Sequence, residues 1–444
     1  MHKVSVIGAG VSGQGLALLA HNLGYEVFVS EKKDITPEAK SLFTQNNIAY
    51  EEGHSPKIFE CDEILISSGI PPQSEILREA MKRGVKLTGE LDFVIPHIRT
   101  QRLVCITGSN GKSTVTSLTG HILTHSGLKA GTGGNLGTAS SRFTQEDFDA
   151  VVLELSSFQL ARATKNLHSI VSVITNLAPD HIDWHGSYEA YVEAKSRVLS
   201  LRDPKGWGII QDRDFDALSP NGKIITLSWS AKPEHDTAGH IFMAEDRAAL
   251  TLGGETSTLF TYDDTTLIGS HNLENVAMSL CAVKLLGVDI SHNVKNLLEG
   301  FRPLPHRCED AGTVDGVRYI DDSKGTNVAA SITAMKSING RKIVILGGQG
   351  KGEDYAPLAE AVKSECDYAV LIGEEAGKIQ SALETAGYTT FRRASTMEEA
   401  LDISRSLARP GMTVLLSPAC TSWDMYKSYK ARGEHFCRIV SAWK

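Results

Sequence analysis

Ile106-Thr107-Gly108-Ser109-Asn110-Gly111-Lys112-Ser113-Thr114 is the stretch of sequence that decides the fold of this chain. It follows an apolar run at 103–106 and precedes a helical pattern of apolar residues at 118–123, so a strand, a glycine loop and a helix succeed one another. Such a loop presents backbone N–H groups to a phosphate at the helix N-terminus. Lys112 can reach the terminal phosphates, and the Ser113 hydroxyl can ligate Mg²⁺. We therefore expect an ATP site made of Gly108, Ser109, Asn110, Gly111, Lys112, Ser113 and Thr114.

This loop is shorter than the standard phosphate loop. The standard pattern has a glycine five residues before Gly111, and Ile106 stands there instead. A plain glycine-rich turn is the alternative, but the Lys-Ser pair at the start of the helix favours nucleotide binding.

The composition limits the classes of protein to consider. A chain of 444 residues is too long for one ordinary core, so about two or three domains are expected. No apolar run approaches the roughly 18 residues that a membrane helix needs, and the N-terminus enters a strand-like segment without the pattern of a signal peptide. The net charge of −8 and the absence of Lys/Arg blocks argue against nucleic acid or an anionic membrane as a partner.

The seven cysteines are scattered and form no CxxC pair. This usage indicates a reducing compartment rather than a disulfide framework or a zinc site, and we expect the chain to be cytoplasmic. We also expect it to act as a monomer that neither inserts into a membrane nor binds nucleic acid.

The first 98 residues alternate strands (4–7, 26–30 and 63–67) with helices (the first at 11–23). Their first turn, Gly8-Ala9-Gly10-Val11-Ser12-Gly13, matches the dinucleotide fingerprint, and Glu31 ends the second strand where an acid would meet a ribose. NAD fits this turn, a sugar nucleotide diphosphate fits it as well, and a purely structural turn is the third possibility. A second turn at 67–72 should face the same crevice, because ligands gather at the carboxyl ends of parallel strands.

Two linkers divide the rest of the chain. The first is expected at 96–102 and the second at 302–305. Between them we expect strands at 150–155, 170–175 and 208–210, followed by an antiparallel stretch at about 223–268. The last segment has strands at 317–320, 342–346, 368–372 and 413–416. The predicted fold is therefore α/β with three domains: 1–98, Rossmann-like; 99–302, P-loop ATPase-like with a mixed sheet; and 303–444, Rossmann-like.

Two features of the middle segment place charge in unusual surroundings. Glu154 lies inside the apolar strand Val151-Val152-Leu153-Glu154-Leu155, where a carboxylate is costly unless it is paired or bound to a cation, so we expect it to organise Mg²⁺. Its alternative is a half-exposed strand residue. Lys195 falls on the apolar stripe of a helix at 188–201. A lysine that extends its amine to solvent is the favoured interpretation, and a lysine held inside the site is the alternative.

The polar loop Thr175-Asn176-Leu177-Ala178-Pro179-Asp180-His181-Ile182-Asp183-Trp184-His185 follows another strand. His181 and His185 are four residues apart with Asp183 between them, which allows zinc, but Pro179 makes a helix here doubtful and no cysteine is near. Groups near Mg²⁺-ATP are the preferred interpretation, and a surface loop without a role is the alternative.

Three strand ends of the last segment carry polar clusters. These are Asp321-Asp322-Ser323-Lys324-Gly325-Thr326-Asn327, Gly347-Gly348-Gln349-Gly350-Lys351, and Ser417 to Asp424, whose end is expected to cap a helix. Upstream of them, Arg307 lies at the domain junction, where it could reach the γ-phosphate. Each loop alone is ordinary, but together they predict a rim that binds anions.

Ten motifs in order give the chain a close resemblance to the Mur ligases, in particular to the branch that adds D-glutamate. The motifs are TGSNGKST (107–114), GGNLG (133–137), LELSSFQL (153–160), NLAPDHID (176–183), EAKSRV (193–198), SHNLEN (270–275), LPHR (304–307), DDSKGTN (321–327), LGGQGK (346–351) and SPACTSWDMYKSY (417–429).

The resemblance implies an activity and a division of labour between the domains. The first domain would bind UDP-N-acetylmuramoyl-L-alanine, the second ATP and two Mg²⁺ ions, and the third D-glutamate, which would be joined through an acyl phosphate. Lys112 would bind the β- and γ-phosphates, Ser113 and Glu154 would hold one Mg²⁺, and His181 would hold the second with Lys195 in its N-carboxylated form.

The resemblance also assigns the remaining contacts. Nucleotide and acyl-phosphate contacts would come from Asn272, Asn275, Arg307, Asp322 and Lys324. Substrate contacts would come from Gly10, Val11, Ser12, Glu31, Ser68, Gly69, Asn135, Ser156, Thr326, Lys351, Ser422 and Tyr429. Many members have Asp-Thr where this chain has Glu31-Lys32, which leaves the uracil contacts open. Tyr429 replaces the more usual Phe, and this should matter little if its contact is through the backbone.

Two other functions remain open on the sequence. One is a related amide ligase such as folylpolyglutamate synthetase, against which the GAGVSG turn counts. The other is a P-loop ATPase switch coupled to an NAD-binding module, which would bind NADH and need no amino acid.

Overall fold

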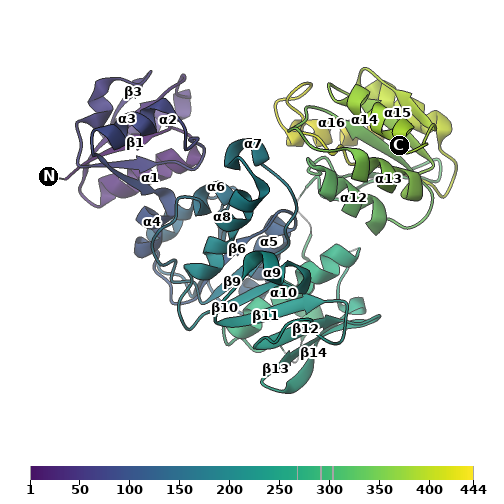
Figure 1. Cartoon of the computed structure of the whole chain (residues 1–444), viewed down its shortest axis with the longest axis horizontal. Coiled ribbons are helices and arrows are strands. Elements are labelled where there is room, and N and C mark those ends of the chain that lie inside the picture. The colour runs from purple at the N-terminus through teal and green to yellow at the C-terminus, as the bar shows by residue number, and fades with distance from the viewer. Residues whose placement is uncertain (1, 268, 291–292, 303–304, 444) are drawn as a thin grey trace. The chain divides into compact units, whose positions relative to one another are not determined.

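A computed structural model describes residues 2–267, 269–290, 293–302 and 305–443, and these residues form three separate β-sheets (Figure 1). The chain divides into two compact units. The first comprises Met1–Leu177, Tyr188–Thr266 and Glu274–Phe301, and the second comprises Ala178–Ser187, Leu267–Leu273 and Arg302–Lys444. The first unit holds two of the sheets and the second holds one. The predicted α/β fold is confirmed, with one sheet in each of the three segments that the sequence analysis distinguished.

The N-terminal sheet is parallel throughout, in the order β3-β2-β1-β4-β5. Its order reverses between β1 and β4, which places a crevice at the carboxyl ends of these strands. The strands are β1 Lys3–Ile7, β2 Glu26–Glu31, β3 Ala49–Glu52, β4 Glu63–Ile66 and β5 Lys86–Gly89, and the helices are α1 Val11–Asn22, α2 Pro37–Gln45, α3 Glu75–Lys82 and α4 Glu90–Val94.

Gly8 and Gly13 allow the close approach of β1 and α1. Gly8 has φ +98°, and a Cβ on Gly13 would stand 1.9 Å from the Gly8 carbonyl oxygen. Both positions therefore require glycine. Gly10 differs, because a Cβ there would meet no atom within 4 Å. Its missing side chain leaves space above the turn rather than inside the fold.

The central sheet has nine strands in the order β14-β13-β12-β11-β10-β9-β6-β8-β7 among the described residues. We expected the stretch at 223–268 to be antiparallel, and this was wrong for its first half: β11 and β12 extend the parallel sheet, and only β13 and β14 run antiparallel. The strands are β6 Leu103–Thr107, β7 Ala130–Gly134, β8 Ala150–Glu154, β9 Val171–Ile174, β10 Trp207–Gln211, β11 Lys223–Ser228, β12 Gly239–Met243, β13 Arg247–Leu252 and β14 Glu255–Thr261.

In the central segment, short loops at the carboxyl ends of β6, β8 and β9 are each followed by a helix. Apolar residues of α8 pack with Cys105 and Leu153 in one buried cluster. The helices are α5 Lys112–His125, α6 Ser157–Leu160, α7 Ile182–His185, α8 Tyr188–Ser200, α9 Phe215–Leu218, α10 Ser270–Leu285 and α11 Val294–Leu298. Pro179 made a helix in this loop doubtful, and the structure corrects this: the single turn of α7 begins at Ile182, after that proline.

The third sheet has the order β15-β16-β20-β17-β18-β19 in the part of the second unit that is described. All pairs are parallel except β15 with β16. Since β20 lies between β16 and β17, the carboxyl ends of these three strands are adjacent. The strands are β15 Glu309–Val314, β16 Val317–Asp321, β17 Lys342–Gly347, β18 Tyr368–Ile372, β19 Phe391–Arg393 and β20 Thr413–Leu416; the helices are α12 Val328–Ser337, α13 Ala356–Glu365, α14 Ala376–Thr385, α15 Met397–Leu407 and α16 Tyr429–Ser441.

The last helix begins later than the sequence suggested. We expected a helix cap near Asp424, but α16 begins at Tyr429, and the Ser428 hydroxyl accepts the Ala431 N–H as its cap (3.2 Å). The residues after β20 instead form turns, one of which bonds the Tyr426 N–H to the Ser422 carbonyl (2.7 Å).

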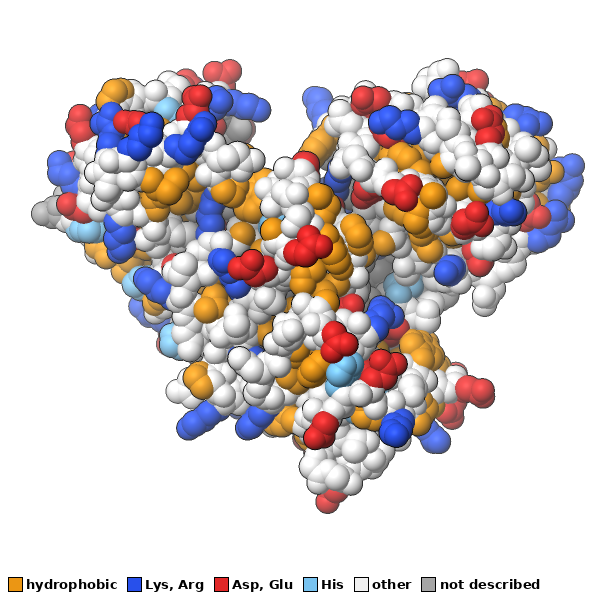
Figure 2. Space-filling model, viewed as in Figure 1, with side chains coloured by type: hydrophobic (Ala, Val, Ile, Leu, Met, Phe, Trp, Pro, Cys, Tyr) orange, Lys and Arg blue, Asp and Glu red, His pale blue; other side chains and the backbone are white. Residues whose placement is uncertain are grey.

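Three further observations concern the expected environment. No helix in the described ranges is long and apolar enough to cross a membrane. All seven cysteines are free thiols. On the face drawn in Figure 2, Lys and Arg side chains are interspersed with Asp and Glu side chains.

Pro303 and Leu304, on which the second predicted linker and the start of the LPHR motif fall, lie outside the described residues.

Candidate functional site

The predicted phosphate loop connects β6 to α5 and is anchored on the end of β9. The Ser109 N–H donates to the Asn176 carbonyl (2.9 Å), and the Asn110 N–H donates to Asn176 Oδ1 (3.0 Å). Gly111 caps α5 in the left-handed region, with φ +80°. Lys112 Nζ donates to the carbonyls of Gly108 and Ser109, both at 2.8 Å. The strand, loop and helix predicted around Lys112 are confirmed.

Lys195 contacts the same loop. Its side chain is buried at 2% exposure, and its Nζ donates to the Gly108 carbonyl at 2.6 Å. The favoured interpretation, an amine that reaches solvent, was wrong. Because the Gly108 carbonyl accepts from Lys112 as well, two ammonium groups share one oxygen. Tyr191 completes this arrangement: its ring lies 4.6 Å from Lys195 Nζ, and its hydroxyl lies 2.8 Å from Ser109 Oγ.

Glu154 ends β8, which pairs with β6 so that Glu154 lies opposite Ile106. It is 2% exposed, so the alternative of a half-exposed strand residue is wrong. Asn135 Nδ2 donates to its Oε1 at 2.9 Å, and its Oε2 is buried with no hydrogen-bond partner. An unpartnered buried carboxylate oxygen is costly, and a hard cation is the kind of group that satisfies it.

The residues after Glu154 form a tight cap. Ser156 Oγ accepts the Gln159 N–H (3.2 Å), and Gln159 Oε1 accepts both the Ser156 N–H (2.9 Å) and the Ser156 hydroxyl (3.0 Å). This reciprocal capping box fixes the Ser156 hydroxyl at the start of α6.

Asn272 and Asn275 both lie on α10, but they are counted in different compact units. Asn275 is buried, and a Cβ on Gly111 would stand 2.6 Å from its Oδ1. The structure therefore brings Asn275 to the phosphate loop.

The crevice predicted at the N-terminal sheet is present as a cleft of about 800 Å³. Gly8, Glu31, Ile70 and Pro71 line it together, so the first turn, the second strand end and the second turn do face one cleft. Glu31 is not an unengaged acid, because its Oε2 accepts the Ala9 N–H at 2.8 Å. Beside the turn, the Val11 side chain is 64% exposed.

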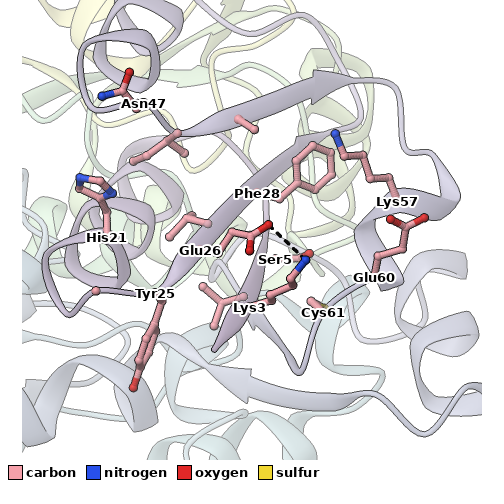
Figure 3. A pocket seen from close by; sticks show the side chains of 15 residues that line it. Lys3, Ser5, His21, Tyr25, Glu26, Phe28, Asn47, Lys57, Glu60 and Cys61 are labelled. Atoms are coloured by element: carbon pink, nitrogen blue, oxygen red, sulfur yellow. Dashed lines mark ion pairs between the residues drawn. The ribbon is translucent and has the colours of Figure 1, made fainter. Parts of the chain in front are cut away.

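A second depression of about 410 Å³ lies at the opposite, amino ends of β1, β2 and β3 (Figure 3). Two of its charged groups contact neighbours: Lys3 Nζ lies 3.3 Å from Glu26 Oε1, and Lys57 Nζ lies 4.8 Å from the Phe28 ring centroid. None of the predicted site residues lines it.

In the second unit, Asp322 lies at the carboxyl end of β16. Burial raises its pKa to about 7, opposed by the Ser417 hydroxyl, which donates at 2.6 Å, and by the charge of Arg307. Lys324 Nζ lies 4.2 Å from the ring centroid of Tyr429, whose carbonyl accepts from the Ser323 hydroxyl at 2.9 Å. The predicted rim is therefore tied to the start of α16 through Lys324 and Ser323.

Lys351, at the end of the β17 loop, donates to Asp180 Oδ1 at 3.0 Å. Asp180 belongs to the polar loop that the second compact unit includes. Glu353 lies beside this pair: burial raises its pKa to about 7, with Lys351 lowering and Asp180 raising it. Glu353 Oε1 is buried and has no hydrogen-bond partner. Lys351 thus already holds a carboxylate of its own chain.

The other predicted residues of this rim differ in exposure. Ser422 is 2% exposed and follows Thr421, whose hydroxyl donates to the Gln349 carbonyl at 2.9 Å. Thr326 is half-buried and its N–H donates to the Lys324 carbonyl at 2.8 Å. The loops after β16, β17 and β20 are therefore bonded to one another, as adjacent strand ends require.

His181 has φ +53° at the start of α7, and its Nε2 lies 3.6 Å from Asp180 Oδ2. His181, Asp183 and His185, the possible zinc ligands, do not form a group of side chains that could hold a metal ion in the described part of the chain. The cluster that is found is His306, Glu309 and Asp321, with His306 Nδ1 2.6 Å from Asp321 Oδ2.

The predicted residues thus gather in three places. Gly108 to Thr114, Asn135, Glu154, Ser156, Lys195 and Asn275 surround the ends of β6 and β8. Glu31 lines the N-terminal crevice, while Gly10, Val11 and Ser12 follow β1 and Ser68 and Gly69 follow β4 without being among its lining residues. His181, Asn272, Arg307, Asp322, Lys324, Thr326, Lys351, Ser422 and Tyr429 belong to the second unit. Sequence reasoning missed the contacts of Tyr191, Asn176 and Asp180. The only signals for these contacts were that Asn176 and Asp180 follow a strand and that Tyr191 lies on the same helix as Lys195.

Known proteins resemble the chain along its length. Successive family models match: the MurD N-terminal domain at residues 3–76, the Mur ligase middle domain at 106–283 and the Mur ligase, glutamate ligase domain at 306–420. The UDP-N-acetylmuramoylalanine--D-glutamate ligase of Pelotomaculum thermopropionicum is 33% identical over 100% of this chain and 98% of the relative. The enzyme of the same name from Natranaerobius thermophilus is 35% identical over 99% and 97%.

A solved structure shares the fold. The MurF ligase of Thermotoga maritima, solved in complex with ADP, superimposes with a TM-score of 0.59 at 15% sequence identity, covering 94% of each chain.

Proposed function

The chain belongs to the Mur ligase family, and from that membership we propose that it joins D-glutamate to UDP-N-acetylmuramoyl-L-alanine, with conversion of ATP to ADP and phosphate. The observation that carries this choice within the family is the match over nearly the full length of both chains to two ligases named for D-glutamate. The match of residues 3–76 to the MurD N-terminal domain supports the same choice and favours it over the folylpolyglutamate and NAD-module alternatives.

The proposed reaction has two steps. The terminal carboxylate of the UDP-sugar substrate attacks the γ-phosphorus of ATP; an oxygen–phosphorus bond forms, the bond to the bridging oxygen breaks, and ADP leaves. The neutral amine of D-glutamate then attacks the acyl phosphate carbonyl, loses a proton, and inorganic phosphate leaves the tetrahedral intermediate. A carboxylate and a triphosphate repel each other, so the site must neutralise their approach.

Lys112 and the first turn of α5 support ATP as the nucleotide. The Lys112 ammonium is held 2.8 Å from the loop carbonyls of Gly108 and Ser109, so it is already positioned where phosphate oxygens would replace these acceptors. Asn272 and Asn275 would contact the adenine, and Arg307, Asp322 and Lys324 would serve the γ-phosphate and acyl end.

The donor set fits Mg²⁺. Glu154 Oε2 is a buried, unpartnered oxygen at the end of β8, and hard oxygen donors are what this ion prefers. Ser113 and Glu154 would hold one ion, and His181 with N-carboxylated Lys195 would hold a second. When bound, the ions would neutralise charge on the phosphate oxygens.

N-carboxylation of Lys195 is supported by its surroundings. The ammonium groups of Lys195 and Lys112 both donate to the Gly108 carbonyl, at 2.6 and 2.8 Å. Two positive charges held against one oxygen destabilise each other. A carbamate formed from the neutral amine and CO₂ turns one of these cations into an anion. The geometry thus favours loss of the Lys195 charge.

The remaining assignments divide the chain at the predicted boundaries. Residues 1–98 would bind the UDP-sugar through Gly10, Val11, Ser12, Glu31, Ser68 and Gly69, with Asn135 and Ser156 of residues 99–302 contacting the muramoyl-alanine. Because the Glu31 carboxylate is bonded to the Ala9 N–H, we propose that it shapes the turn and reaches the nucleoside only with its other oxygen. Residues 303–444 would bind D-glutamate through Thr326, Lys351, Ser422 and Tyr429.

A substrate panel tests the assignment. The purified chain with ATP, Mg²⁺ and UDP-N-acetylmuramoyl-L-alanine should form an amide, detected by mass, with D-glutamate and not with L-glutamate, L-alanine or L-lysine. Omission of any one substrate should abolish product. Phosphate release that is independent of an amino acid, or stabilisation by NADH in place of the UDP-sugar, would reject the ligase assignment.

A further inference from the structure

His54 lines the N-terminal crevice, and the proposed reaction gives it no role. It lies two residues beyond β3, and β3 pairs with β2, whose other neighbour is β1. Neighbouring strands lie about 4.8 Å apart, so His54 is on the order of 10 Å along the sheet edge from the turn after β1. A base that is joined through a ribose to a diphosphate at that turn would extend in this direction.

Glu31, at the end of the intervening strand, already holds backbone donors. Its Oε2 accepts the Ala9 N–H at 2.8 Å, and its Oε1 accepts the Lys33 N–H at 3.1 Å. Both oxygens of this carboxylate are therefore engaged in shaping the two loops beside it. We expect a base in the crevice to find its acceptor on another side chain.

A series of hydrogen bonds behind His54 begins at Glu51. This carboxylate accepts from the Ser30 hydroxyl at 2.7 Å, from the Ser55 N–H at 3.0 Å and from the Ser55 hydroxyl at 2.5 Å. Burial opposes its ionisation, but the hydrogen bonds from Ser55 and Ser30 outweigh burial and lower the pKa of Glu51. An ionised carboxylate only accepts, so the single proton of the Ser30 hydroxyl is used by Glu51.

Ser30 must then accept from His54. His54 Nδ1 lies 2.8 Å from Ser30 Oγ, and because the hydroxyl proton points to Glu51, Nδ1 supplies the proton of this bond. Burial lowers the pKa of His54, which keeps the ring neutral. In a neutral imidazole with its proton on Nδ1, Nε2 is an acceptor. Nε2 makes no hydrogen bond to any residue in the described ranges, so it is left for a ligand.

We propose that His54 is a specificity-determining residue for the nucleobase: its Nε2 accepts the N3–H of uracil and rejects cytosine. Uracil carries a proton on N3 between its two carbonyl groups, whereas cytosine presents a lone pair at N3. Ser30 and Glu51 act behind His54 by holding the tautomer in which Nε2 is an acceptor. The proposal rests on the proposed function, because the UDP-sugar is taken as the ligand of this crevice.

Binding of UDP and of CDP to the full chain, measured by calorimetry, tests the proposal without a catalytic assay. Wild type should bind UDP at least about tenfold more tightly than CDP, the scale of one hydrogen bond replaced by two facing lone pairs. His54→Asn keeps an amide nitrogen for Ser30 but has no atom in the place of Nε2. It should weaken UDP binding about tenfold and reduce the preference for UDP to less than about threefold.

His21→Asn is the matched control. His21 lines the second depression, at the opposite ends of the same strands (Figure 3). The same substitution at this position should leave the affinities for UDP and CDP within about twofold of wild type, well below the loss of one hydrogen bond.

Ser30→Ala tests the tautomer directly. Without the Ser30 acceptor, the His54 proton can move to Nε2, which then donates to N3 of cytosine. CDP binding should tighten about threefold or more, while UDP binding weakens by less than about threefold.

The outcomes separate this proposal from the proposed function. A wild-type chain that binds UDP and CDP equally, a His54→Asn variant that keeps the full preference, or a Ser30→Ala variant without a gain for CDP would overturn the role of His54. Amide formation with D-glutamate would still stand in each of these cases. A chain that binds no UDP and forms no amide would overturn the proposed function, and this proposal with it.

Discussion

Lys351 and Asp180 form an ion pair in which the lysine Nζ lies 3.0 Å from the aspartate Oδ1. Both side chains are largely buried, at 16 and 10% exposure, so this contact is shielded from solvent more than a surface pair would be. The lysine that we assign to a carboxylate of D-glutamate is thus occupied by a carboxylate of its own chain. An incoming amino acid must replace Asp180 on Lys351 or share the lysine with it.

Replacement of Lys351 should affect one substrate. Lys351→Ala removes a charge-assisted bond to a D-glutamate carboxylate and should raise the KM for D-glutamate about ten- to hundredfold, with smaller changes for ATP and the UDP-sugar. Lys378→Ala is the control, because the Lys378 side chain is 72% exposed and pairs with Glu375 at 2.8 Å. Initial rates with each substrate varied in turn check this. Equal KM changes for all three substrates would contradict the assignment of Lys351.

Glu353 should make amino acid binding depend on pH. Burial raises its pKa to about 7, so its carboxyl is neutral below that pH and anionic above it. The anion competes for Lys351 and repels a carboxylate ligand. We therefore expect the Kd for D-glutamate to increase as pH rises through about 7, and Glu353→Gln to remove most of this increase. Calorimetric titrations between about pH 6 and 8.5 measure this Kd for the wild type and for Glu353→Gln. A pH dependence that survives in Glu353→Gln belongs to another group.

Two glycines of the first turn should separate stability from binding. Gly13→Ala places a Cβ 1.9 Å from the Gly8 carbonyl oxygen and should cost about 1 to 3 kcal/mol in the free energy of unfolding. Gly10→Ala meets no atom within 4 Å and should change that free energy by less than about 0.5 kcal/mol. It should nevertheless weaken UDP-sugar binding, because the diphosphate approaches the backbone there. Thermal unfolding and ligand titration of both variants check the contrast, and tight binding by Gly10→Ala would place the diphosphate elsewhere.

Lys195 gives the test of N-carboxylation. Lys195→Ala should abolish ligation, and acetate or propionate should restore part of the rate by supplying a carboxylate in the vacated space, whereas Lys195→Met should not respond because its side chain fills that space. Steady-state rates with and without the acids measure this. Full activity of Lys195→Ala, or equal responses of the two variants, would reject the carbamate.

The sequence predicted most of the strands because buried parallel strands are short apolar runs between turns. The burial of Glu154 could also be predicted, since a carboxylate within such a run has no exposed face. The prediction failed at β11 and β12, where the more polar composition suggested an antiparallel stretch but the neighbouring strands are parallel. The composition of a strand indicates how deeply it is buried. The direction in which it pairs depends on the neighbouring strand, which composition does not reveal.

The same limit applies to Lys195 and α16. Helical periodicity placed Lys195 on the buried stripe of its helix. Only the fold shows that the Lys195 ammonium donates to the Gly108 carbonyl. Residues 417–424 resemble a helix start, yet the helix begins at Tyr429 because the intervening turns bond to Gln349 and Ser422 instead. Contacts between distant segments, such as Lys351 with Asp180, leave no local signal.

Transfer of carboxylate oxygen tests the central claim most directly. The UDP-N-acetylmuramoyl-L-alanine carboxylate is labelled with ¹⁸O, and the inorganic phosphate released during ligation is analysed by mass. Attack of that carboxylate on ATP predicts that each phosphate carries one oxygen from the substrate, in proportion to the labelling, with one amide formed per phosphate. Phosphate without the label would show that water attacks ATP, and would contradict an acyl phosphate as the intermediate.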